Sequence, residues 1–235
     1  MIGMVEISAA YIIENEANPV FKASLESILS IADEVIIIDG GSTDGTLELI
    51  DSFHSKKIKV IYKKFLHDSL GADGIQRNEY LKYVTKDWVL VIDADEVLGD
   101  NGFMLKKIAE ENSFDAYDLR MVHFVDNLAF VDATKEEHLV PRRFFKNKPG
   151  LKYPEKEHAI LEGYSNPGVI TDVTLFHYGF TFGVWKNLKK YRMNLKKSNY
   201  SPEWLRDWID SRLLGKYPSK PFEGEHPAPI KELLK

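Results

Sequence analysis

The chain has 235 residues, of which 44% are hydrophobic and 29% are charged, and its formal net charge is −5. This composition is typical of a globular protein and excludes a disordered or fibrous one. The net negative charge offers no attraction for nucleic acid, so we expect no nucleic-acid partner. The absence of cysteine excludes disulfides and thiolate zinc sites. Oxygen and imidazole ligands remain, which favours Mg²⁺ or Mn²⁺ over zinc.

The N-terminal segment lacks the basic start and the small-residue cleavage site of a signal peptide. No apolar run reaches the roughly 18 residues that span a membrane. We therefore expect a cytoplasmic location. A lysine-rich helix expected at 181–199, together with Trp185, Trp204 and Trp208, leaves open a peripheral contact with the inner face of the membrane.

Apolar runs of strand length alternate with helical patterns over the first half of the chain, which is typical of βαβ units that build a parallel sheet. The runs expected to be strands are 5–13, 34–39, 58–62 and 88–92. Asn18 followed by Pro19 predicts a helix start, and further helices are expected near Asp44 and over 72–85. Parallel strands share a carboxyl edge, where ligands usually bind.

Beyond residue 115 the pattern changes to AYDLRMVHFVD and HLVPRRFFKN, which predict antiparallel strands. A further helix is expected to start at Pro202, and the tail from Pro218 is expected to be extended. The fold class we predict is α/β, with a mostly parallel sheet flanked by helices and a small antiparallel part. We place this catalytic domain at residues 1–180 and a helical C-terminal extension, packed on it, at 181–235.

The segment WVLVIDADEVL, residues 88–98, ends an apolar strand with Asp93, Asp95 and Glu96. Carboxylates this close repel one another and cost stability unless a cation or water screens them. A hard divalent cation is the natural counterion for an Asp-X-Asp at a strand end, so we expect the balancing positive charge to come from a metal ion. The alternative is a solvated acidic turn before a helix near Asp100.

Four segments occur in one order: ISAAYIIENEANPVFKASLESIL, IADEVIIIDGGSTDGTLELI, GIQRNEYLKYVTKDWVLVIDADEVL and FHYGFTFGVWKNLKKY. Together they resemble the inverting glycosyltransferases of family 2, which have the GT-A fold, over about residues 4–195. An ordered set is more specific than any single motif. The resemblance implies transfer of a sugar, with inversion, from a nucleoside diphosphate sugar of the UDP or GDP type to a hydroxyl of a glycan, a lipid-linked acceptor or a protein.

The resemblance also implies roles for single residues. Asp39 would contact the base or the ribose of the donor, and Glu14 lies near the expected base pocket. Asp95 would bind Mn²⁺ or Mg²⁺, with Asp93 nearer the ribose. His177 would complete the metal shell.

Two of the segments depart from the family pattern or allow a second interpretation. Many members have Asp-Asp-Gly-Ser where this chain has DGGS, so Gly40 replaces a carboxylate and the base preference stays open. Arg77 and Asn78 match an Arg-Asn pair of the family, and the planar fork of an arginine suits a diphosphate. The alternative for Arg77 is an ion pair with Glu79 or another surface acid.

The segment RRFFKNKPGLKYPEKEHAIL resembles the family stretch in which an Arg-X-Phe strand leads to a His-Glu pair. An inverting transfer needs a base that takes the proton of the acceptor hydroxyl. The order in this chain is Glu157 and then His158, so we expect Glu157 to be the catalytic base, with His158 in reserve. A charged loop without chemistry is the alternative.

Two other functions stay open. A sugar nucleotidyltransferase also holds Mg²⁺ with carboxylates, but it typically has a glycine-rich loop and a basic residue after the first strand, and YIIENEANP has neither. An inactive module of the same fold would use the basic, aromatic C-terminal region to hold a glycan or a membrane surface. A dehydrogenase is disfavoured because no GxGxxG follows the first strand.

Overall fold

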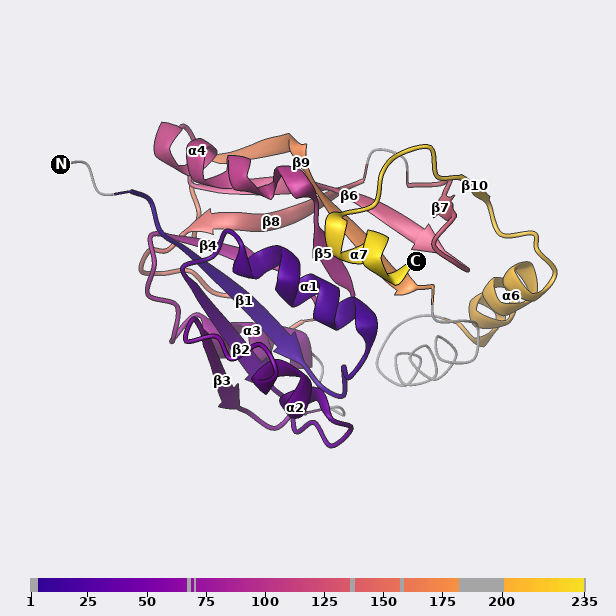
Figure 1. The fold of residues 1–235 in the computed structure, drawn as a ribbon, viewed down its shortest axis with the longest axis horizontal. Coiled ribbons are helices and arrows are strands. Elements are labelled where there is room, and N and C mark those ends of the chain that lie inside the picture. Colours follow the sequence, from indigo (N-terminus) through magenta and orange to yellow (C-terminus); the bar gives the residue numbers. More distant parts are fainter. Residues whose placement is uncertain are drawn as a thin grey trace.

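The computed structural model of the chain describes residues 4–66, 69, 71–135, 138–156, 159–181 and 201–234. Its N-terminal half confirms the alternating pattern. The strands are β1 (Ile7–Ile13), β2 (Glu34–Asp39), β3 (Ile58–Tyr62) and β4 (Trp88–Val91). They are parallel and lie in the order β3-β2-β1-β4, so their carboxyl ends meet at one edge (Figure 1).

Three helices connect these strands: α1 (Pro19–Leu29), α2 (Thr46–Asp51) and α3 (Ala72–Tyr80). The predicted start of α1 is confirmed, because Asn18 Oδ1 accepts from the backbone N–H groups of Val20 and Phe21, both at 3.0 Å. Helix α3 ends earlier than the predicted residue 85. After Tyr80 the chain turns instead, with Tyr83 N–H donating to Tyr80 O at 2.9 Å.

The second half contains the predicted antiparallel pair, β6 (Ala116–Val125) and β8 (Leu139–Lys146). Strand β8 also pairs antiparallel with β4 and so joins the two halves in one sheet. A long strand, β9 (Pro167–Phe180), runs parallel to β6, and the short β5 (Glu96–Leu98) pairs antiparallel with it. Between β5 and β6 lie η1 (Asp100–Phe103) and α4 (Met104–Glu111).

The C-terminal part contains α6 (Pro202–Leu213), β10 (Ser219–Pro221) and α7 (Ala228–Leu233). The tail is therefore not simply extended as predicted. Strand β10 pairs with β7 (Phe130–Asp132), and α7 lies beside α1 (Figure 1). Ile230 of α7 is fully buried with Val20 and Ala23 of α1, and Trp208 of α6 is buried as well. None of the described helices is long and apolar enough to cross a membrane.

The core lies on both faces of the sheet. Along β4, Leu90 packs with Phe21 and Leu25 of α1, whereas its neighbours Val89 and Val91 pack on the opposite face with Tyr80 of α3. Successive side chains of a strand point to opposite faces. Since helices cover both faces, every position of this strand is apolar, which explains the unbroken apolar run in the sequence.

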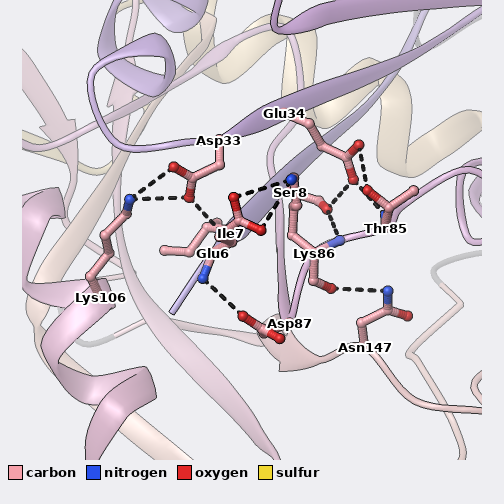
Figure 2. Close-up of polar contacts among 10 residues, drawn as sticks. All are labelled: Glu6, Ile7, Ser8, Asp33, Glu34, Thr85, Lys86, Asp87, Lys106 and Asn147. Carbon is pink, nitrogen blue, oxygen red and sulfur yellow. Dashed lines mark hydrogen bonds and ion pairs between the residues drawn. The ribbon is translucent and has the colours of Figure 1, made fainter. Parts of the chain in front are cut away.

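A polar network ties the starts of the strands together at the amino edge (Figure 2). Asp33 Oδ2 accepts from the N–H of Ile7 at 2.8 Å and lies 3.0 Å from Lys106 Nζ. Glu34 Oε2 accepts from Thr85 Oγ1 at 3.0 Å. These polar groups satisfy one another, so they stabilise the amino edge, and the carboxylates expected to carry chemistry lie at the other edge.

Candidate functional site

The carboxyl edge brings together the side chains that follow β1, β2 and β4. Asp39 ends β2 and is buried, with 3% of its surface exposed. Its carboxylate accepts from the N–H of Ser42 at 3.1 Å and from Ser42 Oγ at 2.6 Å. The N–H of Gly41 also donates to it, at 3.2 Å. Asp39 therefore shapes the turn after β2, in addition to the donor contact predicted for it.

Glu14 follows β1 and lies beside this turn, half-buried. A Cβ at Gly40 would lie 3.2 Å from the Cβ of Glu14 and 3.0 Å from the Cβ of Phe65. Both distances are tighter than ordinary contacts. The stems of Glu14 and Phe65 therefore take the space that a side chain at position 40 would need, which gives a physical reason for the glycine where the family often has a carboxylate.

Asp93 follows β4 and meets two arginines. Arg77 Nη2 of α3 lies 2.7 Å from Asp93 Oδ1, and Arg143 Nη2 of β8 lies 2.9 Å from Asp93 Oδ2. Burial raises the pKa of Asp93, but Arg143 and Arg77 outweigh it and hold this pKa well below its usual range. The chain itself thus supplies positive charge at Asp93, and Asp95 stays the carboxylate that is expected to bind the metal ion.

Arg143 and Glu96 are two site residues to which sequence reasoning gave no role. Glu96 lies in β5 and is 2% exposed. Its Oε1 lies 2.7 Å from Arg143 Nη2 and its Oε2 accepts from the N–H of Asp93 at 2.9 Å. Burial, opposed by Arg143 and supported by Asp93, raises the pKa of Glu96 to about 7. The signals for Arg143 were its place before two phenylalanines in a predicted strand and the resemblance of this segment to the Arg-X-Phe strand of the family.

Asp95 and His177 face each other across β5 and β9. Asp95 Oδ2 and His177 Nε2 are 3.6 Å apart. The backbone fixes this arrangement, because Glu96 is in register with His177 and the N–H of Tyr178 donates to Asp95 O at 2.8 Å. His177 thus lies within β9, near its end.

Gly179 lies directly against these two side chains. A Cβ at this position would lie 2.7 Å from His177 Nε2 and would also press on Asp95 Oδ2, so only a glycine allows their present placement. A carboxylate oxygen next to an imidazole nitrogen fits Mn²⁺ well and Mg²⁺ less well. The described residues form no group of three or more His, Cys, Asp or Glu side chains that could hold a metal ion by themselves.

Glu157 and His158, the expected base and its reserve, lie outside the described residues. The segment just before them packs closely on α3. Asn78 Nδ2 donates to Tyr153 O at 2.7 Å, and the N–H of Tyr153 donates back to Asn78 Oδ1 at 2.8 Å. A Cβ at Gly74 would collide with the carbonyl of Pro154. Helix α3 therefore holds both Arg77 and the segment that leads to the expected base.

Comparison with solved structures confirms the predicted fold class, the GT-A fold. The structure of S. aureus TarS 1-349 matches with a TM-score of 0.54 and 17% identity, over 90% of this chain and 71% of that one. The mannosyltransferase PcManGT from Pyrobaculum calidifontis, solved with GDP-Man and Mn²⁺, matches with a TM-score of 0.53 and 14% identity, over 99% of this chain and 69% of that one.

The model of the family described as "Glycosyl transferase family 2" matches residues 11–181. The chain belongs to this family. The SPbeta prophage-derived glycosyltransferase SunS of Bacillus subtilis (strain 168) is 26% identical over 205 residues, which is 85% of this chain and 45% of that protein. An uncharacterized glycosyltransferase of Rickettsia felis is 39% identical over 95 residues, 40% of this chain and 30% of that protein. The chain thus spans less than half the length of these curated relatives.

Proposed function

We propose that this glycosyltransferase moves a sugar from a nucleoside diphosphate sugar to an acceptor hydroxyl by direct displacement, with inversion at the anomeric carbon, and that a divalent cation assists. The observation that carries this proposal is the pair Asp95 and His177, whose Oδ2 and Nε2 lie 3.6 Å apart against Gly179. The pair lies next to the carboxyl edge, where Asp39 ends β2 and Asp93 follows β4, the usual ligand position in a parallel sheet.

The nucleoside of the donor would lie against the ends of β1 and β2. Asp39 is placed to accept from the base or the ribose, and the carboxylate of Glu14 lies beside it. Asp93 would accept from the ribose, because Arg77 and Arg143 keep it ionised and fix its direction. A diphosphate of the UDP or GDP type suits this arrangement, and PcManGT was solved with the guanosine form.

Asp95 and His177 would hold the cation, Mn²⁺ or Mg²⁺. When bound, it would neutralise the charge that develops on the leaving diphosphate. Because the described residues supply only this pair, oxygens of the donor diphosphate would provide further ligands, as is usual for such cations in phosphate sites. The presence of Mn²⁺ with GDP-Man in PcManGT supports this choice.

Proton transfer from the acceptor hydroxyl falls to Glu157, with His158 as the reserve. The support for this assignment is that Asn78 and Gly74 of α3 contact Tyr153 and Pro154, in the segment that leads to these residues.

The acceptor would be a hydroxyl of a glycan, a lipid-linked acceptor or a protein. We also propose the division into a domain at 1–180 and an extension at 181–235, and a peripheral contact with the inner face of the membrane through that extension.

Calorimetric titration tests the proposal. The full chain is titrated with UDP, GDP, CDP and their common sugar conjugates, with Mn²⁺ and again with a chelator. We expect one diphosphate to bind with Mn²⁺ and to bind much more weakly with the chelator. Asp95→Asn should lose the metal dependence, and Lys22→Gln, a change at an exposed residue, is a control that should keep it. Folded protein that binds none of these nucleotides contradicts the proposal and favours an inactive module.

A further inference from the structure

Three histidines form a row that ends at the candidate metal site. His123 of β6 is in register with His177 of β9, and His138 directly precedes β8. His123 Nδ1 lies 3.2 Å from His177 Nδ1, and His123 Nε2 lies 2.6 Å from His138 Nδ1. His123 is buried, with 7% of its surface exposed. Both of its ring nitrogens therefore bond to other imidazoles.

The two hydrogen bonds must run in the same direction along the row. A neutral imidazole has one N–H donor and one acceptor nitrogen. His123 is buried between two other imidazoles, a position that favours the neutral ring. If His123 accepts from His177 at Nδ1, it donates to His138 from Nε2. If it donates to His177 instead, it accepts from His138.

A cation held by Asp95 and His177 distinguishes the two directions. With the proton on Nδ1 of His177, the lone pair of Nε2 is available beside Asp95 Oδ2. In the reverse direction an N–H at Nε2 would face that oxygen at 3.6 Å, which is too long for a hydrogen bond. Only the first direction leaves a nitrogen that can bind a cation.

We propose that His123 and His138 are positioning residues that hold His177 with its proton on Nδ1, so that Nε2 presents its lone pair beside Asp95. This inference rests on the proposed function, because the cation at Asp95 and His177 selects between the two directions. Partners of this kind orient a metal-binding imidazole, and their loss typically lowers metal affinity about 10- to 100-fold.

The position of the protons can be measured without any ligand. We would label the histidines with ¹⁵N and record two-bond ¹H–¹⁵N correlations at pH 7.5, with single histidine variants for assignment. We expect His177 to carry its proton on Nδ1, and His123 and His138 to carry theirs on Nε2. The exposed His54 provides a reference for a histidine outside the row. A proton on Nε2 of His177 overturns the proposal.

A second measurement tests the consequence for metal binding. Binding of Mn²⁺ in the presence of UDP or GDP is followed by the electron paramagnetic resonance signal of free Mn²⁺. We expect His123→Leu to weaken binding about 10- to 100-fold and His123→Gln to restore part of it, because the amide oxygen can accept from His177 Nδ1. His54→Asn should bind as the wild type does.

The outcomes of this second measurement separate the two proposals. Folded His123→Leu that binds Mn²⁺ as tightly as the wild type overturns the positioning role. Wild-type protein that binds no Mn²⁺ with either diphosphate contradicts the proposed function. The measured proton positions then still show whether His177 donates from Nδ1 to His123.

Discussion

Replacement of Arg143 by methionine tests the ion pairs that support the candidate site. Arg143 Nη2 bonds to Asp93 Oδ2 at 2.9 Å and to Glu96 Oε1 at 2.7 Å, and its side chain is 11% exposed. Methionine fills most of the same volume without a charge. The variant therefore leaves Glu96 without its cation, whereas Asp93 keeps Arg77.

The size of the effect follows from the burial of Glu96. Removal of one partner of a buried ion pair costs about 3–5 kcal/mol of folding free energy, because the other charge is left uncompensated. The pKa of Glu96 is already raised to about 7, so this carboxyl can take a proton at neutral pH at little further cost. We therefore expect the lower end of the range, about 3 kcal/mol. Arg77→Met loses a single pair and should cost about 1.5 kcal/mol.

Urea unfolding at pH 7 measures both values, provided the m-value stays that of the wild type. In the double variant Arg143→Met with Glu96→Gln, no charge remains buried at position 96, and the amide oxygen can still accept from the N–H of Asp93. We expect the double variant to regain at least a third of the loss. The reasoning is refuted if Arg143→Met unfolds within 1 kcal/mol of the wild type, or if the double variant regains nothing.

Three further predictions concern the metal site, acid stability and the tail. Gly179→Ala places a Cβ against His177 Nε2 and Asp95 Oδ2. Calorimetry should therefore show that Mn²⁺-dependent binding of the diphosphate is at least about tenfold weaker. An unchanged affinity contradicts a cation site at Asp95 and His177. Burial raises the pKa of Asp115, but Lys148 and the N–H groups of Ser165 and Asn166 outweigh it and hold this pKa well below its usual range. The stabilisation of the fold by the ionised Asp115 carboxylate is thus present above about pH 4 and is lost as the pH falls through the folded pKa. Asp115→Asn should lower the free energy of unfolding by about 1–3 kcal/mol at pH 7 and by less at pH 2. An equal loss at both pH values would refute the lowered pKa of Asp115. Ile230→Ala should cost about 2–5 kcal/mol in urea unfolding, because Ile230 is fully buried; a loss below 1 kcal/mol would show that α7 does not pack on α1.

Local patterns predicted much of the sheet and the edge at which the candidate site lies. The four parallel strands, the cap at Asn18 and the meeting of Asp39 with Asp93 at one edge all follow from apolar runs and strand polarity. These features depend on residues close together in the chain. The resemblance also selected His177, which the structure places opposite Asp95.

The rest depends on contacts between distant segments. Arg143 reaches Asp93 from 50 positions away along the chain, through a strand pairing that no local pattern specifies. Strand β5 has three residues and exists only because β9 pairs with it. The helix at the end of the tail is likewise stabilised by burial of Ile230 against α1, although the many polar residues of the tail predict an extended segment.

The central claim, metal-assisted transfer at Asp95 and His177, is tested most directly by release of nucleoside diphosphate from the nucleotide sugar that binds. Release is measured with Mn²⁺, with a chelator and in Asp95→Asn, with water or a mixture of glycans as the acceptor. We predict release by the wild type with Mn²⁺ only, and none by folded Asp95→Asn. Release at the wild-type rate by Asp95→Asn would contradict the account.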